Sequence, residues 1–150
     1  MEFTAPSSPS KLGVQIKNLN IGTTLSDKHI QSIRHQWVTY GVAIFPNQKL
    51  TLEQYENFSQ FFGSFGEEPF LIPMQDHPHI VKLHRKPEEE AAHFGGAWHS
   101  DWSFQHAPPS ATMLYSEIIP PTGGDTLFAN TADAYDDLTD ELKEKIQNMR

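Results

Sequence analysis

The chain has 150 residues, of which 37% are hydrophobic and 20% are charged, and its formal net charge is −8. This composition is typical of one soluble globular domain and argues against wholesale disorder or a second independent core. The negative charge gives no electrostatic reason to expect nucleic acid or an anionic membrane as a partner. Because the chain has no cysteine, disulfides, zinc–thiolate sites and iron–sulfur clusters are excluded, and any metal must be held by histidine and carboxylate.

The N-terminal segment carries no targeting signal that we can identify. No apolar run approaches the roughly 18 residues needed to span a bilayer, and residues 1–10 lack the basic and apolar regions of a signal peptide. A cytoplasmic location is therefore the default expectation. Residues 1–10 are rich in proline and serine and are expected to form a flexible N-terminus without regular structure. Residues 11–150 are expected to form the domain.

The first part of this domain predicts a strand, a helix and a second strand. Residues 11–21 alternate apolar and polar side chains, which favours a half-buried strand. Ser26 is expected to cap a helix that runs to about Tyr40 and ends at a C-cap glycine. Its buried stripe is expected to comprise Ile30, Ile33 and Trp37. Residues 42–45 form a continuous apolar run, which predicts an interior strand.

A second helix is predicted after Thr51, because Thr51 and Gln54 stand at the spacing of a capping box. Apolar residues recur at helical spacing along one face of this helix: Leu52, Tyr55, Phe58, Phe61 and Phe62. This spacing is far more typical of a packed core than of a cofactor site.

The rest of the chain predicts mainly extended segments joined by turns. Strands are expected over residues 79–83, 98–104, 110–119 and 125–128, and helical turns are expected over residues 131–135 and, capped by Thr139, through Ile146. The charged segment 85–92 predicts a solvated loop, and a mobile lid is the alternative.

His99 and Asp101 are the candidate metal ligands. They stand two residues apart, so in a strand their side chains would leave the same face, with Ser100 on the other. Histidine plus carboxylate is two thirds of the facial triad of non-haem iron oxygenases. By itself the pattern is also typical of a surface histidine beside a solvated aspartate. Thr126 could return beside this strand and offer a hydroxyl to an anionic ligand, although threonine is also simply a good strand residue.

Three motifs together resemble those of the taurine dioxygenase (TauD/TfdA) family of Fe(II)- and 2-oxoglutarate-dependent oxygenases. They are Trp98-His99-Ser100-Asp101-Trp102-Ser103-Phe104, then Pro108-Pro109, then Pro121-Thr122-Gly123-Gly124-Asp125-Thr126-Leu127-Phe128. Their order and separation are much more specific than the histidine and aspartate alone. The predicted elements upstream also resemble the N-terminal region of this family, so the likeness covers nearly the whole chain after residue 10.

The resemblance implies an α+β, mainly β fold: a double-stranded β-helix (jelly-roll, cupin-like) with flanking helices. Residues 11–150 would be its N-terminal and incomplete part. The resemblance also implies that His99 and Asp101 bind Fe(II) and that Thr126 contacts the cosubstrate 2-oxoglutarate, with O2 as the oxidant. It implies no catalytic residue beyond the metal ligands.

The implied reaction hydroxylates a C–H bond of a small anionic organic substrate and forms succinate and carbon dioxide. Trp98, Trp102 and Phe104 would line the substrate pocket, although packing inside the barrel is an equally good role for them. Taurine is a doubtful substrate, because the family's sulfonate-binding histidine and asparagine should lie near Phe70 and Gly95, neither of which can bind a sulfonate in that way. Halogenation is disfavoured because the halogenating relatives have a small residue in the place of Asp101, which leaves that metal position open for halide.

The second iron-binding histidine and the 2-oxoglutarate-binding arginine of the family would lie beyond residue 150. We therefore expect this chain to be the N-terminal part of a longer enzyme and residues 1–150 alone to be inactive. Two alternatives remain: a non-catalytic metal-binding or interaction module on the same scaffold, and a cupin-like hydrolase or isomerase that uses another metal. The expected partner is a small-molecule substrate, with no nucleic acid or membrane, and a homo-oligomer is left open.

Overall fold

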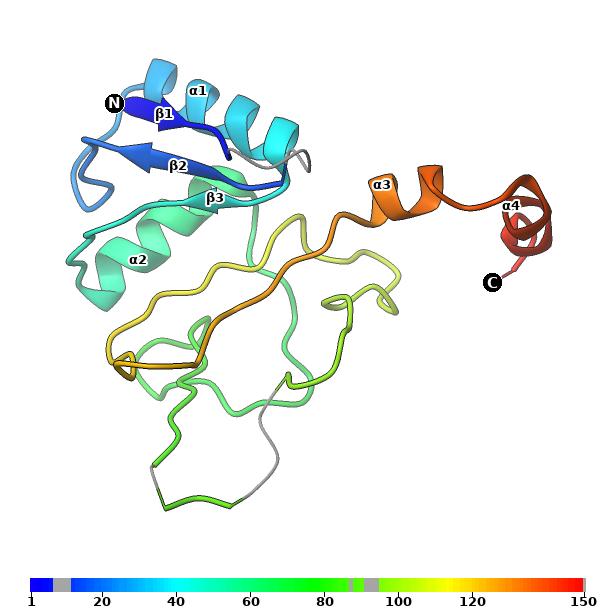
Figure 1. Ribbon diagram of the computed structural model, residues 1–150. Helices are drawn as coiled ribbons and strands as arrows, with labels where there is room; N and C mark the ends of the chain where they lie inside the picture. The colour runs from blue at the N-terminus through cyan, green and yellow to red at the C-terminus, as the bar shows by residue number, and fades with distance from the viewer. Residues whose placement is uncertain (7–11, 87, 91–94, 150) are drawn as a thin grey trace. The chain divides into compact units, whose positions relative to one another are not determined.

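The computed structural model describes residues 1–6, 12–86, 88–90 and 95–149 (Figure 1). The chain divides into two units. The first comprises Met1–Leu19, Ser26–Asn47 and Glu117–Arg150, and the second comprises Asn20–Leu25 and Gln48–Ser116. None of the helices in the described ranges is long and apolar enough to cross a membrane.

The first unit contains a three-stranded sheet in the order β1-β2-β3 (Figure 1). Strand β1 (Glu2–Thr4) pairs antiparallel with β2 (Val14–Lys17), with Phe3 opposite Ile16. Strand β3 (Ala43–Ile44) pairs parallel with β2. A parallel pair needs a crossover connection, which here is the helix between β2 and β3.

Helix α1 (Asp27–Tyr40) provides this crossover and packs on β2 and β3. It begins as predicted at Ser26, whose side chain accepts a hydrogen bond from the backbone N–H of His29. It ends at Gly41, whose φ of 69° favours glycine. The core of the unit consists of buried side chains from β2 and α1: Val14, Ile16, Ile30 and Ile33. The predicted helical stripe is therefore confirmed for its two isoleucines, whereas Trp37 is only half-buried.

Two predictions for this unit are wrong. Residues 1–10 were expected to lack regular structure, but Glu2–Thr4 forms β1. Strand β2 supplies the backbone hydrogen-bond partners of β1, and the proline- and serine-rich composition of residues 1–10 does not reveal this pairing. Residues 7–10 lie outside the described residues. The predicted strand 42–45 is confirmed only as the short β3, and it lies at an edge of the sheet, with Ile44 46% exposed, rather than in the interior.

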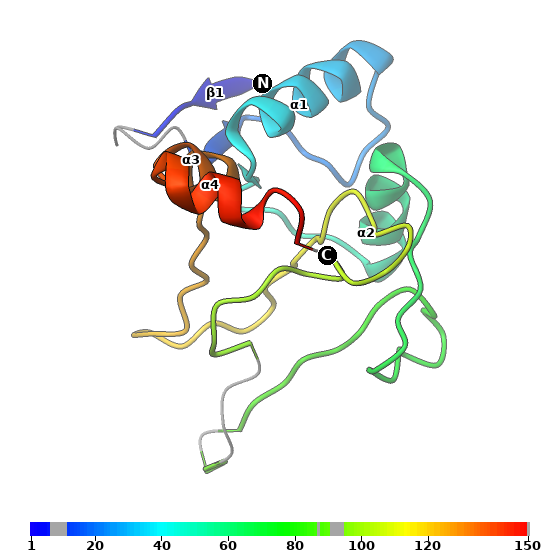
Figure 2. The ribbon, with the colours of Figure 1, turned by 90° about the vertical axis from the view of Figure 1, so that its right-hand side faces the viewer.

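The last two helices also belong to the first unit and confirm the predicted helical segments (Figure 2). Helix α3 (Thr131–Asp136) is capped by Asn130, whose side chain accepts hydrogen bonds from the N–H groups of Ala132 and Asp133. Helix α4 (Asp140–Ile146) is capped by Thr139. Both caps are local, so each helix start could be inferred from neighbouring residues.

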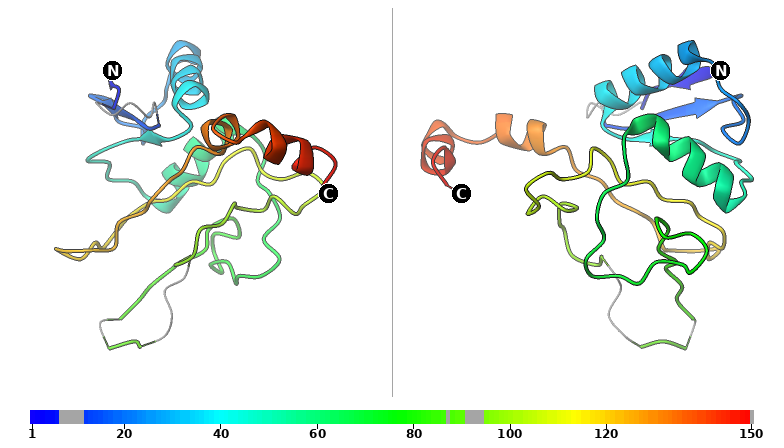
Figure 3. Two further views of the ribbon diagram at one scale, coloured as in Figure 1. Left: turned by 45° about the vertical axis from the view of Figure 1, so that its right-hand side comes forward. Right: turned by 180° about the vertical axis from the view of Figure 1, so that it is seen from behind.

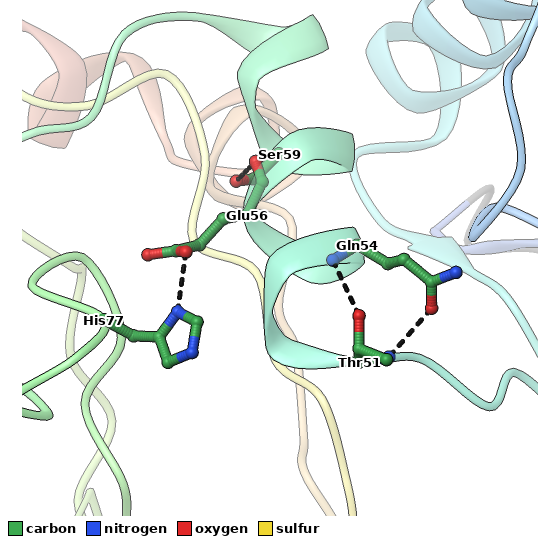
Figure 4. A network of polar contacts seen from close by, with 5 residues as sticks. All are labelled: Thr51, Gln54, Glu56, Ser59 and His77. Carbon is green, nitrogen blue, oxygen red and sulfur yellow. Dashed lines mark hydrogen bonds and ion pairs between the residues drawn. The ribbon is translucent and has the colours of Figure 1, made fainter.

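The second unit is built around α2 (Leu52–Ser59), which continues into the 3-10 helix η1 (Gln60–Phe62). The predicted capping box is confirmed: Thr51 Oγ1 accepts from the Gln54 N–H, and Gln54 Oε1 accepts from the Thr51 N–H (Figure 4). The aromatic face of α2 is partly buried, and Phe58 is 1% exposed. The other buried apolar residues of this unit are Ile21, Leu25 and Ile80.

Side-chain hydrogen bonds tie α2 to distant segments of the second unit. The Tyr55 hydroxyl donates to the Met113 carbonyl oxygen, and the Tyr115 hydroxyl accepts from the Leu50 N–H at 3.0 Å. The two rings lie 5.6 Å apart between centroids. Burial raises the pKa of Tyr55 from 10.0 to about 12, so the hydroxyl remains a protonated donor even in moderately alkaline solution.

A histidine–glutamate pair makes a second such tie (Figure 4). His77 Nδ1 donates to Glu56 Oε2 at 2.8 Å, and both side chains are largely buried. The other carboxylate oxygen, Oε1, is buried without a hydrogen-bond partner in the described part of the chain. His77 also closes a turn, because its carbonyl accepts from the Ile80 N–H at 3.0 Å. The predicted strand 79–83 is wrong, because this turn occupies its first two residues and residues 81–83 pair with no strand in the described part of the chain.

The predicted strands over residues 98–104, 110–119 and 125–128 are wrong as well. Within the described residues, no strand or helix lies between η1 and α3, and the chain there follows an extended, irregular course (Figure 3). Strands are defined by hydrogen bonds to a neighbouring strand, and these segments have no such ladder here. The alternation of apolar residues predicted an extended backbone, but it does not show whether a neighbouring strand is present to form the hydrogen bonds of a sheet.

Replacing Thr51 with alanine should lower the free energy of unfolding by about 1 kcal/mol, because the N–H of Gln54 loses its acceptor. Thr51→Ser keeps a hydroxyl in the same position and should keep most of the stability. The midpoint of denaturant unfolding measures both changes. Equal midpoints for the alanine and serine variants would show that the cap does not stabilise α2.

Replacing Glu56 with alanine should cost on the order of 1–3 kcal/mol, because it leaves the partly buried Nδ1 of His77 without its acceptor. Glu56→Gln keeps an oxygen acceptor and should lose less. Asn57→Ala, at the adjacent exposed position of α2, is the matched control and should be nearly neutral. Thermal unfolding of the three variants checks this order, and an equal loss in Glu56→Ala and Asn57→Ala would contradict it.

Candidate functional site

The segment with the candidate metal ligands is a series of turns, not a strand. Trp102 has a φ of 53°, a left-handed conformation that costs a bulky residue about 1–2 kcal/mol. Its carbonyl oxygen accepts a hydrogen bond from the Gln105 N–H at 3.0 Å, and the hydroxyls of Ser100 and Ser103 lie 2.7 Å apart. These contacts over three residues bend the backbone, which is the physical reason why the predicted strand 98–104 does not form.

His99 and Asp101 nevertheless converge. His99 Nε2 lies 3.1 Å from Asp101 Oδ1, and the two side chains are 55% and 45% exposed. The other ring nitrogen, Nδ1, lies 2.8 Å from the Ala97 carbonyl oxygen. Gly95 has a φ of 67°, and a Cβ placed there would lie 3.4 Å from His99 Cε1, so glycine suits the conformation at this end of the turn.

The contact with Ala97 fixes the orientation and tautomer of the imidazole. A carbonyl oxygen can only accept, so Nδ1 must carry the hydrogen. In the neutral ring, Nε2 then presents a lone pair to the carboxylate oxygen of Asp101. Two lone pairs at this distance attract a cation between them, either a proton or a metal ion. A backbone carbonyl that holds the far ring nitrogen is also the usual support of a metal-binding histidine.

The spacing of the two atoms fits a first-row divalent metal. With metal–ligand bonds of about 2.1 Å, neighbouring ligand atoms at a right angle lie about 3.0 Å apart. The observed 3.1 Å between Nε2 and Oδ1 agrees with this separation, and equally with a direct hydrogen bond or ion pair between the two side chains. Nitrogen and carboxylate oxygen are the ligands of non-haem iron sites. Among the described residues, no group of three or more histidine, cysteine, aspartate or glutamate side chains is placed to hold a metal ion.

Three aromatic rings form a cluster that begins next to Asp101, and we call Phe70, Trp102 and Phe104 the aromatic trio. The rings of Phe70 and Trp102 are stacked, with centroids 5.8 Å apart and an interplanar angle of 16°. Phe104 lies 5.8 Å from Phe70 and 5.7 Å from Trp102. Trp102 and Phe104 are predicted pocket residues, and the family resemblance places the sulfonate-binding histidine of the family near Phe70. The ring contacts of Phe70 with Trp102 and Phe104 could not be read from local spacing, because Phe70 is distant from both in sequence.

The other predicted site residues are exposed. Trp98 is 71% exposed, and Thr126 lies in exposed, irregular backbone of the first unit. The predicted turn before Thr126 is present, and both of its glycines adopt the left-handed backbone conformation that favours glycine, with φ values of 77° at Gly123 and 76° at Gly124. A Cβ on Gly124 would lie 3.1 Å from Pro120 Cγ, so this position also favours glycine for its lack of a side chain.

Comparison with known sequences identifies relatives over almost the whole chain. The "Alkylsulfatase" of Acinetobacter baylyi is 31% identical over 140 residues, which cover 93% of this chain and 43% of the relative. The "Alpha-ketoglutarate-dependent 2,4-dichlorophenoxyacetate dioxygenase" of a Burkholderia species is 29% identical over 151 residues, covering 91% of this chain and 51% of the relative. The chain therefore spans about half the length of these curated relatives.

Comparison with solved structures also identifies proteins that are similar to this chain. The crystal structure of a taurine dioxygenase from Burkholderia xenovorans matches 98% of this chain and 51% of its own, with a TM-score of 0.81 and 27% sequence identity. The profile of the family described as "Taurine catabolism dioxygenase TauD, TfdA family" matches residues 4–150. The resemblance stated from the sequence is thereby confirmed. This chain belongs to the TauD/TfdA family of taurine catabolism dioxygenases.

Proposed function

We propose that this chain contributes to an Fe(II)- and 2-oxoglutarate-dependent dioxygenase that hydroxylates a C–H bond of a small anionic organic substrate. The observation that carries the proposal is the convergence of His99 Nε2 and Asp101 Oδ1 at 3.1 Å, with Nδ1 held by the Ala97 carbonyl. Membership of the family and the name of the dichlorophenoxyacetate dioxygenase relative support it.

His99 and Asp101 would hold the iron as two of its three protein ligands. The third ligand, a histidine, and the arginine that binds 2-oxoglutarate would come from outside residues 1–150. One observation supports this division: the relatives are about twice as long as the chain.

Thr126 would donate its hydroxyl hydrogen to the carboxylate of 2-oxoglutarate. Support comes from the motif, in which two glycines with positive φ lead the chain into this threonine. A hydroxyl that donates to a carboxylate makes a charge-assisted hydrogen bond, which is stronger than one between neutral groups.

When bound, the iron would supply the activation of O2 and the oxidative decarboxylation of 2-oxoglutarate to succinate and carbon dioxide. The residues of the chain would position the metal and shield the substrate side of the site from water. Ala97 keeps the His99 ring in the tautomer that a metal requires, and Asp101 adds a negative charge that favours a divalent cation. Trp98 and the aromatic trio would restrict access of water to the substrate side of the metal.

Replacing His99 or Asp101 with alanine should weaken Fe(II) binding by the full-length protein by more than about 100-fold, because loss of a direct ligand exceeds the 10- to 100-fold cost of losing an outer-shell partner. His35→Ala, which removes an exposed histidine of α1, is the matched control and should bind iron normally. Anaerobic titration with Fe(II) and 2-oxoglutarate, followed by the visible charge-transfer band of the chelated keto acid, measures these affinities.

The outcomes of this titration separate the alternatives. Succinate formation from 2-oxoglutarate by the full-length protein, lost in both alanine variants, supports the dioxygenase. Iron binding without the visible band and without succinate would instead favour the non-catalytic module or a hydrolase or isomerase that uses another metal. Unchanged iron affinity in both alanine variants would reject the assignment of the ligands.

Replacing Thr126 with valine should weaken 2-oxoglutarate binding about 10- to 100-fold, because a hydrogen bond to a charged group is lost while the branched shape is kept. Affinity for Fe(II) alone should not change. Thr122→Val, an exposed position in the preceding turn, is the control and should leave both affinities unchanged. Titration of the iron-loaded protein with 2-oxoglutarate tests the role, and equal affinities in the two variants would reject it.

A further inference from the structure

Two segments of the second unit lie against each other without forming a sheet, and we call their contact the side-chain seam. The seam consists of two hydrogen bonds from side chains to main-chain carbonyl oxygens. Ser110 Oγ donates to the carbonyl of Phe62 at 3.2 Å. Gln105 Nε2 donates to the carbonyl of Glu67 at 3.1 Å. Because each bond joins residues that are distant in sequence, the seam fixes the two segments relative to each other where strand pairing does not.

The seam is closely packed, and the segment that supplies its acceptors has a defined backbone. A Cβ on Gly66 would lie 3.3 Å from Pro109 Cβ, so the lack of a side chain at Gly66 allows the two segments to approach. In the acceptor segment, Glu68 Oε1 accepts from the backbone N–H groups of Phe70 and Leu71, each at 2.8 Å. This segment can therefore serve as an anchor for whatever is bonded to it.

Gln105 connects the seam to the turn that carries the metal pair. Its backbone N–H donates to the Trp102 carbonyl oxygen at 3.0 Å, while its half-buried side chain reaches the Glu67 carbonyl. Trp102 has a φ of 53°, which is unfavourable for a bulky residue and persists only where the surroundings require it. Gln105 thus ties the unfavourable residue of the turn to a segment outside the turn.

The two members of the metal pair are supported differently. His99 is oriented by the Ala97 carbonyl oxygen, which holds the ring through Nδ1. In the described part of the chain, the Asp101 carboxylate has no polar partner except His99 Nε2. The position of this carboxylate therefore depends on the backbone that carries it, and Trp102 is the next residue along that backbone. A change of the backbone at Trp102 would move the carboxylate away from the ring.

We propose that Gln105 is a positioning residue for the metal pair. Its side-chain bond to Glu67 fixes the turn so that Asp101 Oδ1 stays directed at His99 Nε2. This inference rests on the proposed function, in which the pair holds Fe(II). Gln105 acts through the backbone of Trp102 and is not itself a ligand. A residue of this kind contributes by keeping the ligands in the geometry that the metal requires.

The experiment replaces Gln105 in the full-length protein and measures the affinity for Fe(II). Gln105→Met keeps the length of the side chain but cannot donate a hydrogen bond, whereas Gln105→Lys keeps a donor on a stem long enough to reach the same carbonyl. Anaerobic titration with Fe(II) in the presence of 2-oxoglutarate, followed by the visible charge-transfer band, gives the Kd. Gln105→Met should raise this Kd about tenfold, and Gln105→Lys should keep it within about threefold of the unsubstituted value.

Ser110→Ala is the matched control, because it breaks the other bond of the seam, which also joins a side chain to a main-chain carbonyl oxygen. Thermal unfolding of the metal-free protein should show similar, small losses of stability in Ser110→Ala and Gln105→Met. Ser110→Ala should nevertheless keep the Kd for Fe(II) within about twofold, because it lies away from the turn. The inference is overturned by an unchanged Kd in Gln105→Met, by an equal rise in both variants, or by a Kd in Gln105→Lys as high as that in Gln105→Met.

His99→Ala in the same titration distinguishes failure of this inference from failure of the proposed function. The ligand assignment stands if the unsubstituted protein binds Fe(II) and forms the visible band while His99→Ala loses both. In that case a normal Kd in Gln105→Met rejects only the positioning role. If the unsubstituted protein shows neither iron binding nor the band, or if His99→Ala binds iron normally, the proposed iron site is rejected, and the role of Gln105 is rejected with it.

Discussion

The hydrogen bond between His99 Nδ1 and the Ala97 carbonyl oxygen is the constraint on which the candidate site depends. In a turn, residues two apart have no inherent reason to face the same point, because the alternation of a strand is lost. The bond replaces that alternation: it orients the imidazole so that Nε2 faces Asp101 Oδ1. A nitrogen lone pair and a carboxylate oxygen held together in this way favour a bound cation, whichever backbone conformation carries them.

The surroundings of the site are stabilised by side chains rather than by a sheet. An irregular segment must still satisfy its backbone polar groups, and here side chains supply partners at several points. The Tyr55 hydroxyl donates to the Met113 carbonyl, Gln105 donates to the Glu67 carbonyl, and Ser110 donates to the Phe62 carbonyl at 3.2 Å. Each bond joins segments that are distant in sequence. The second unit can therefore hold a defined course without regular secondary structure over most of its length.

Local features of this chain could be predicted well. The helix starts at Ser26 and Thr51 depend on side chains that bond to backbone groups three residues away, and the stop at Gly41 depends on one residue's freedom to adopt positive φ. Strand β1 and the absence of a strand over residues 98–104 could not be predicted. The first depends on a partner strand, and the second depends on the left-handed conformation of Trp102 and the turn contacts around it.

The sequence by itself determined the helix boundaries, the apolar faces, the candidate ligand pair and the family, because each rests on residue types at short, fixed spacings. Only the tertiary structure showed that His99 and Asp101 converge from a turn, and that Phe70 joins Trp102 and Phe104 in one aromatic group. The physical reason is the same in both cases. Spacing along a chain reports which side chains can share a face of a regular element, whereas contacts in an irregular segment depend on long-range hydrogen bonds and ring packing that no local pattern encodes.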